Sequence, residues 1–177
     1  MEIRFLTAED VAAYRDLRLL ALRESPSAFI SSYEQEAQLS LADFAARLHT
    51  NNDAGGGVFG AFSDRNHLIG MLGFSRENRP KRVHVGSLRS MYVSPEFRGQ
   101  GVGSSLLDTA IAHARKLGGL RQIVLSVTAG NVAAVSLYQS RGFESFGLER
   151  DSLCIDGTYF DEEYLVLRLP PDTEPVS

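Results

Sequence analysis

Apolar residues recur at three- and four-residue intervals along several segments of this 177-residue chain. Such spacing places apolar side chains on one face of a helix. Thr7, with an acid three residues later, resembles a capping box, and Ser25-Pro26 ends the helix that follows. Gly142 ends the last predicted helix. Helices are therefore predicted over four segments: 7–24, 40–52, 103–117 and 131–141.

Short apolar or alternating runs bounded by turn residues predict strands between these helices. The last two strands are joined by Asp156-Gly157, a dipeptide that favours a two-residue hairpin turn. Residues 28–38 show neither period clearly. The predicted strands are 3–6, 58–62, 68–74, 83–93, 122–127, 146–155 and 159–169. We expect residues 1–169 to form one domain and 170–177 to be a disordered tail.

A glycine-rich turn lies between the strand that ends at Val93 and the helix over 103–117. It reads Arg98-Gly99-Gln100-Gly101-Val102-Gly103-Ser104. N–H groups at a helix start attract anions, and glycines let the backbone approach phosphate oxygens closely. The dinucleotide pattern G-x-G-x-x-G does not fit, because Ser104 or Leu106 stands at the third glycine, and no lysine makes a Walker loop. The pattern predicts a diphosphate-binding turn of another kind.

The residues 98–103 read Arg-x-x-Gly-x-Gly, which resembles the acetyl-CoA pyrophosphate loop of the GNAT superfamily of N-acetyltransferases. The predicted order β-α-α-β-β-β-α-β-α-β-β is also the chain order of that fold. The resemblance covers essentially the whole chain, and its specific motifs lie within about 87–146. It implies an α/β (α+β) fold with a mixed, mostly antiparallel central sheet flanked by helices, and acetyl-CoA as the acyl donor.

The resemblance also implies which residues hold the cofactor. In this family the sheet splays beside the strand that precedes the glycine turn, and the acetyl group lies in the gap. Backbone groups of Met91 and Val93 would meet the pantetheine, and the Met91 N–H would meet an oxyanion. The expected cofactor-binding residues are Met91, Tyr92, Val93, Arg98, Gly99, Gln100, Gly101, Val102, Gly103, Ser104 and Asn131.

Asn131 and Tyr138 are seven residues apart on a predicted helix, so they share one face, roughly 10 Å apart along the axis. The segment 131–143 resembles the second cofactor-binding motif of the family, in which the Asn contacts pantetheine and the Tyr protonates the departing thiolate. A phenol with a pKa of about 10 stays protonated at pH 7 and can donate. Tyr138 is thus the candidate catalytic residue. The alternatives are a helix N-cap for Asn131 and a core-edge aromatic for Tyr138.

The general base that accepts the proton of the attacking amine is not evident. Some members of the superfamily carry Glu or His on the strand before the glycine turn. Here His84 lies at the far end of that strand and Arg89 lies near the expected place. We expect a water chain to a more distant acid, with Glu36 and Glu149 as candidates.

The resemblance places the acceptor pocket between the first-helix region and the last hairpin. The residues there are Phe29, Ser31, Ser32, Tyr33, Glu36, Tyr159, Phe160 and Asp161. Aromatic rings with carboxylates suit a cationic amine. Phe29, Tyr33, Glu36 and Tyr159 are the candidate substrate-binding residues, and the alternative is that they serve packing and turns.

Composition narrows the partners. A formal net charge of −4 argues against nucleic acid, and no apolar run is long enough to span a bilayer. The first residues show no signal peptide, which predicts a cytoplasmic protein. Cys154 is the single cysteine and is expected to be a small buried strand residue; four scattered histidines indicate no metal site.

These observations predict an acetyl-CoA-dependent N-acetyltransferase in which a primary amine attacks the thioester directly. A small-molecule acceptor is favoured by the acidic balance of the chain. The alternatives are acetylation of protein N-termini or lysines, and a non-catalytic acyl-CoA-binding module. Similar proteins commonly form dimers through their last strands, so a homodimer stays open.

Overall fold

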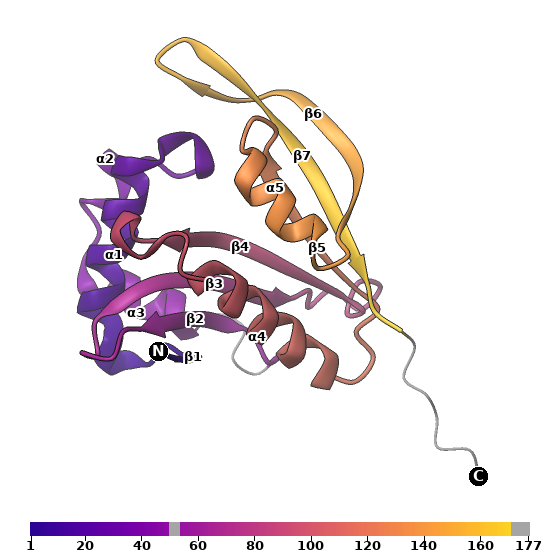
Figure 1. Ribbon diagram of the computed structural model, residues 1–177, viewed down its shortest axis with the longest axis horizontal. Helices are drawn as coiled ribbons and strands as arrows, with labels where there is room; N and C mark the ends of the chain where they lie inside the picture. Colours follow the sequence, from indigo (N-terminus) through magenta and orange to yellow (C-terminus); the bar gives the residue numbers. More distant parts are fainter. Residues whose placement is uncertain (50–53, 171–177) are drawn as a thin grey trace.

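Seven strands form one sheet in the computed structural model, which describes residues 1–49 and 54–170 (Figure 1). They are β1 (Glu2–Phe5), β2 (Gly57–Phe62), β3 (Leu68–Arg76), β4 (Val85–Val93), β5 (Gln122–Thr128), β6 (Glu144–Ile155) and β7 (Thr158–Arg168). Their order is β1-β2-β3-β4-β5-β7-β6. β4 and β5 are parallel, and the remaining neighbours are antiparallel. The predicted mixed, mostly antiparallel sheet is confirmed.

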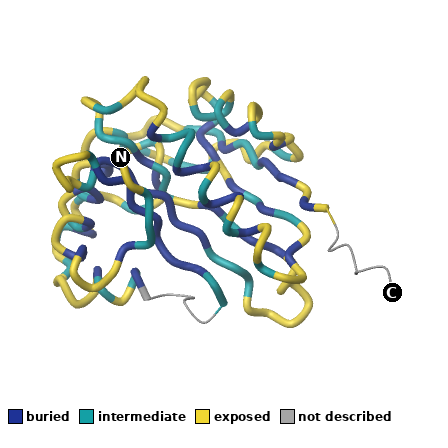
Figure 2. Tube along the Cα trace, turned by 60° about the horizontal axis from the view of Figure 1, so that its bottom comes forward, coloured by how far each residue is buried: buried dark blue, intermediate teal, exposed yellow. Residues whose placement is uncertain are grey.

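Helices cover both faces of this sheet. They are α1 (Val11–Glu24), α2 (Tyr33–Glu36), α3 (Leu41–His49), α4 (Val102–Lys116) and α5 (Val132–Gln139). One buried cluster joins α1 and α3 to the sheet around Phe44 and Met71. A second joins α4 and α5 to the other face around Leu106 and Leu165. Figure 2 shows the buried positions running along the strands between these two helical layers.

Most predicted elements are present, with boundaries shifted by a few residues. The helix expected over 40–52 is α3, and the positions 50–53 lie outside the described residues. The ambiguous segment 28–38 contains the short helix α2, which follows a 3₁₀ turn at Pro26–Ala28. The Ser32 hydroxyl caps α2 by accepting a hydrogen bond from the Gln35 N–H at 3.2 Å. Of the expected tail 170–177, the structure describes Pro170 alone.

The prediction that Cys154 is buried is wrong. Cys154 lies on β6, which is the edge strand beside β7, and its side chain is exposed. No residue of β6 is fully buried, so the structure around this strand covers its side chains only in part. Asp156 (φ 49°) and Gly157 (φ 78°) form the predicted hairpin turn at its end.

β4 separates from β5 and bulges against β3. It pairs with β5 only at 85–87, so its second half has no strand neighbour on that side. Against β3, the register shifts so that Ser90 and Met91 together stand opposite Leu72. Ser90 has φ 56°, a left-handed conformation that costs a residue with a Cβ roughly 1–2 kcal/mol. The bulge leaves Arg89 and Ser90 lining one cavity and Met91 lining another.

Candidate active site

A cavity of about 760 Å³ lies between the second half of β4, the start of α4 and the side of α5. Tyr138 lines it together with every predicted cofactor-binding residue except Gln100. The Gln100 side chain instead turns back, and its Nε2 donates to the Glu96 carbonyl at 2.9 Å. The structure therefore gathers the two motifs, which are separate in sequence, around one space. Further lining residues that the sequence did not indicate are Ser25, Ala28, Phe97, Ala133, Ala134 and Leu137.

The glycine turn has the backbone that its sequence suggests. Gly99 (φ 73°) and Gly101 (φ 80°) both adopt the left-handed conformation, and Gly101 is the N-cap of α4. A Cβ at either position would meet no atom within 4 Å, so the backbone lies open to the surroundings. The first N–H groups of α4 have no carbonyl partner within the helix and carry its positive dipole end. This end of the cavity can hold an anionic group.

Arg98 ties the glycine turn to the end of α1. Its Nη1 and Nη2 donate to the two carboxylate oxygens of Glu24 at 3.0 and 2.6 Å, and its Nε donates to the Val93 carbonyl at 3.0 Å. The Arg98 hydrogen bonds, followed by one from Ser25, lower the pKa of Glu24 to about 2. The sequence places Arg98 in the turn but gives no indication of its partner Glu24, which is 74 residues away.

The Arg98–Glu24 ion pair is expected to make the stability of the protein depend on pH in the acid range. Because the pKa of Glu24 is about 2 in the fold and 4.5 ordinarily, the pair stabilises the protein above about pH 4.5 and loses that contribution as the pH falls through about 2. We expect Glu24→Gln to unfold at a lower temperature than wild type near neutral pH, with the difference shrinking on acidification. Thermal unfolding across that pH range measures it. Glu34→Gln, at an exposed position, should follow wild type, and a Glu24→Gln deficit constant with pH would contradict the role of the pair.

Tyr138 is buried and points its hydroxyl at β4. Its side chain is 6% exposed, and its hydroxyl donates to Met91 Sδ at 3.2 Å. The ring packs edge-on against Phe143 with centroids 5.7 Å apart. Burial raises the pKa of Tyr138 to about 12, so the phenol stays protonated throughout the neutral range. A proton donor therefore stands beside the half of β4 that does not pair with β5.

Asn131 caps α5, as the alternative interpretation proposed. Its Oδ1 accepts from the Ala134 N–H at 3.1 Å. Asn131 also lines the cavity that holds Tyr138. The capping role and a contact with a bound molecule are compatible, because the cap uses only the side-chain oxygen.

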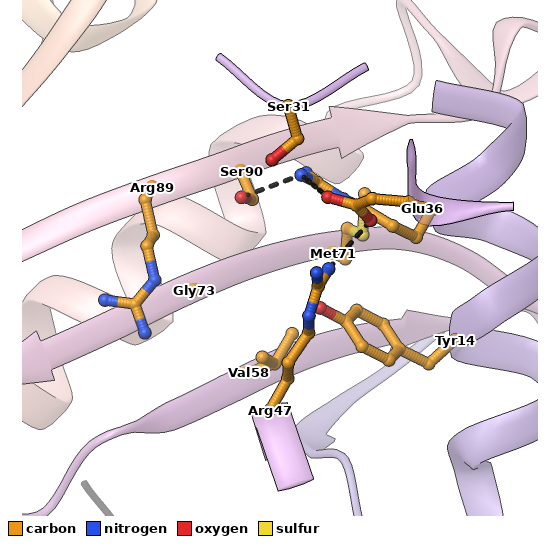
Figure 3. A pocket seen from close by; sticks show the side chains of 10 residues that line it. Tyr14, Ser31, Glu36, Arg47, Val58, Met71, Gly73, Arg89 and Ser90 are labelled. Atoms are coloured by element: carbon orange, nitrogen blue, oxygen red, sulfur yellow. Dashed lines mark hydrogen bonds and ion pairs between the residues drawn. The ribbon is translucent and has the colours of Figure 1, made fainter. Parts of the chain in front are cut away.

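A smaller cavity, of about 260 Å³, lies on the opposite face of β4, under α1, α2 and α3 (Figure 3). Arg18 donates to both oxygens of Glu36 at 3.0 and 2.8 Å and to Ser90 Oγ at 3.1 Å. Arg47 forms a further ion pair with Glu36 at 2.7 Å. Burial alone would raise the pKa of Glu36, but Arg18 above all, with Ser31 and Arg47, holds that pKa below its usual range. Glu36 is thus a paired anion and a weak base.

The four candidate substrate-binding residues do not share one pocket. Glu36 lines the smaller cavity, whereas Phe29 and Tyr33 line a groove beside residues 152–156, at the end of β6 and in the turn that follows. Tyr159 is 62% exposed and lines a depression against 24–28 and 128–131.

Glu149, the other candidate base, is engaged elsewhere. It accepts a hydrogen bond from the Tyr164 hydroxyl at 2.5 Å and lines neither cavity beside β4. The hydrogen bond to Glu149, with burial, raises the pKa of Tyr164 to about 12.

The residues expected at the site did not include Arg18, Arg47 or Ser90. Arg18 carried a signal: it lies four residues after Tyr14 on the apolar face of α1, where a charged side chain needs a buried partner. Arg47 lies on α3 and Ser90 in the β4 bulge, and no local pattern marks either of them.

Within 1–49 and 54–170, no group of three or more His, Cys, Asp or Glu side chains is placed to hold a metal ion. In the same part of the chain, no helix combines the length and the apolar character needed to cross a membrane.

β4 separates from β5 after its first residues, and the glycine turn and α4 follow it in the chain. This arrangement defines an acyltransferase fold. Residues 16–143 match the acetyltransferase (GNAT) family, and the chain belongs to that family. A solved ribosomal-protein-alanine N-acetyltransferase from Brucella melitensis is 25% identical and superposes with a TM-score of 0.83, covering 96% of this chain and 100% of that one. A phosphinothricin acetyltransferase from Sinorhizobium meliloti, solved with acetyl-CoA, is 24% identical with a TM-score of 0.83 over 95% and 88% of the two chains and supports the fold.

Two curated relatives are acetyltransferases whose names specify small molecules. A mycothiol acetyltransferase from Salinispora tropica is 28% identical over 113 residues, which are 64% of this chain and 37% of that protein. An L-methionine sulfoximine/L-methionine sulfone acetyltransferase from Pseudomonas aeruginosa is 28% identical over 137 residues, 77% and 78% of the two chains. The chain spans only 19% to 39% of the length of the mycothiol acetyltransferases that it matches.

Proposed function

We propose that this protein is an acetyl-CoA-dependent N-acetyltransferase in which a primary amine attacks the thioester directly. One observation carries the proposal: a single cavity has the anion-binding start of α4 at one end and the buried Tyr138 hydroxyl beside the separation of β4 from β5. Acetyl-CoA supplies the two features that this arrangement matches, a pyrophosphate and an acyl thioester. Membership of the GNAT acetyltransferase family supports the same conclusion.

Each part of the cavity has a proposed role. The glycine turn 98–104 and the first N–H groups of α4 bind the pyrophosphate. Backbone groups of Met91 and Val93, on the half of β4 that β5 leaves unpaired, bind the pantetheine in the manner of an added strand. The Met91 N–H stabilises charge that develops on the carbonyl oxygen, and Tyr138 donates its proton to the departing sulfur.

No side chain in the described part of the chain stands out as the general base. Glu36 is held by two guanidinium groups, and Glu149 by the Tyr164 hydroxyl. We propose that the ammonium group of the acceptor loses its proton to solvent through water. The proton acceptor then contributes little to the choice between acceptor amines.

A small-molecule amine is the favoured acceptor, and a protein N-terminus is the second candidate. The mycothiol and methionine sulfoximine acetyltransferases support the first. The ribosomal-protein-alanine N-acetyltransferase supports the second. Incubation with acetyl-CoA and either a panel of small amines or a panel of peptides, followed by mass spectrometry of the products, separates them. Binding of acetyl-CoA without transfer to any member of either panel would favour the non-catalytic module.

A further inference from the structure

We propose that the smaller cavity, on the α1 face of β4, binds an anionic group of the acceptor. The acceptor would then be an amine that also carries a carboxylate or a comparable oxyanion, such as an amino acid. This inference rests on the proposed function and names the substrate class for the same site. It narrows the expected small-molecule amine to one that also carries a negative charge.

The charges around the smaller cavity favour an anion. Three guanidinium groups, those of Arg18, Arg47 and Arg89, line it against one carboxylate, that of Glu36. Two positive charges therefore remain in excess. The cavity also receives hydroxyl groups from Tyr14, Ser31 and Ser90. Guanidinium groups match carboxylate geometry, and the hydrogen bonds that they donate to anions are among the strongest in proteins.

Arg18 is held in place before any ligand arrives, and the exposed Arg89 also has a hydrogen-bond partner. The Arg18 side chain is 7% exposed and is fixed by Glu36 and Ser90. Arg89 crosses β3 at Gly73, where a Cβ would lie 3.0 Å from Arg89 Cγ, and its Nη1 donates to Ser75 Oγ at 2.5 Å. Figure 3 shows Arg89 on one side of Gly73 and the Glu36 group on the other. An anion between them would meet guanidinium groups from two directions.

A cationic group fits this cavity poorly. The one carboxylate that lines it, Glu36, already carries two hydrogen bonds from Arg18 and an ion pair with Arg47. An ammonium group of the acceptor that entered this cavity would have to displace one of these guanidinium groups from Glu36. It would also face the positive charge of the others. Acceptors with several amines and no anionic group are therefore disfavoured.

The bulge in β4 lies between the smaller cavity and the larger cavity that is proposed to bind acetyl-CoA, here called the cofactor cavity. Ser90 lines the smaller cavity, and the next residue, Met91, lines the cofactor cavity and contacts the Tyr138 hydroxyl. An acceptor with its anion beside Arg18 can thus extend its amine past Ser90 into the gap where β4 and β5 separate. The size of about 260 Å³ suits a small acceptor, because it lies just below the usual range for drug-sized ligands.

Matched acceptor pairs test the inference. We would measure kcat/KM for the standard L-amino acids, their primary α-amides and aminoalkylphosphonates, each with acetyl-CoA. The expected result is a preference of about tenfold or more for at least one acid over its amide, because the amide lacks a charge-assisted hydrogen bond. The phosphonates distinguish a carboxylate-specific site from one that accepts any oxyanion.

Variants locate the preference in this cavity. Arg47→Gln and Arg89→Gln should each reduce the ratio of acid to amide, chiefly through KM for the acid. Arg18 is left intact, because its loss would strand the buried Glu36 charge and endanger folding. Arg115→Gln, on the exposed side of α4, is the matched control and should keep the wild-type ratio. Thermal unfolding with CoA and each amino acid gives a readout that does not need turnover.

The outcomes separate this inference from the proposed function. Equal kcat/KM for acids and amides, or a ratio unaffected by Arg47→Gln and Arg89→Gln, would overturn the anion site while leaving the transferase intact. Absence of acetyl-CoA binding would instead overturn the proposed function. Stabilisation by acids but not amides, lost in both variants, would support the site even where turnover is slow.

Discussion

Replacing Gly101 by glutamate is expected to abolish the stabilisation of this protein by acetyl-CoA. Gly101 is the N-cap of α4 and has φ 80°, and a Cβ at this position would meet no atom within 4 Å. A side chain there is sterically accommodated, although the left-handed backbone costs roughly 1–2 kcal/mol. The new carboxylate would occupy the positive end of the helix and repel the pyrophosphate. Calorimetric titration with acetyl-CoA measures the loss.

Two controls separate charge from conformation. Gly101→Gln introduces the same shape without charge, so it should keep part of the affinity. Gly118→Glu adds the same charge at an open position outside the cofactor cavity and should bind as wild type does. Normal acetyl-CoA affinity in a folded Gly101→Glu protein would contradict the assignment of the pyrophosphate to this turn.

Tyr138→Phe is expected to lower kcat by a factor of about 100 or more while changing acetyl-CoA affinity only a few-fold. The substitution removes the hydroxyl that faces Met91 Sδ and keeps the packing against Phe143. Because the pKa of Tyr138 is about 12, the wild-type phenol keeps its proton as the pH rises until that value is approached. The deficit of the variant should therefore be constant over the neutral and mildly alkaline range. Steady-state kinetics as a function of pH measures it.

Tyr164→Phe provides a matched comparison. The pKa of Tyr164 is also raised to about 12, by its hydrogen bond to Glu149, but Tyr164 does not line the cofactor cavity. Its hydroxyl should be dispensable for turnover. An unchanged kcat in Tyr138→Phe, or equal losses in the two variants, would remove Tyr138 from the mechanism.

The fold was largely predictable, because its elements carry local signals. The three- and four-residue spacing over 103–117 corresponds to α4, and Asp156-Gly157 forms the turn between β6 and β7. Boundaries shifted where a turn competed with a strand: the Val85 N–H bonds to the Arg82 carbonyl, so β4 begins at Val85 rather than at 83. The exposure of Cys154 depended on its strand lying at the sheet edge, which the sequence of β6 does not reveal.

The two halves of the candidate site differed in how far they could be predicted. The half proposed to bind the cofactor is built from two continuous motifs, so residues close together in the sequence of each motif are also close in space. The acceptor half draws on α1, α2, α3 and β4, and Arg18 and Ser90 are 72 residues apart. Glu36 was recognisable as a candidate, but its role depended on the two arginines that neutralise it. Only the folded structure shows that positive charge exceeds negative charge around this cavity.

The cofactor site is tested most directly by thermal unfolding with acetyl-CoA, with NADH and ATP as controls. A ligand that binds only the native state, at a hundred times its Kd, adds about 2.7 kcal/mol, which raises the Tm of a domain of this size by several degrees. We predict this increase with acetyl-CoA and none of comparable size with NADH or ATP. No increase with saturating acetyl-CoA, or an equal increase with all three compounds, would contradict the assignment of the cavity between β4, α4 and α5 to the acyl donor.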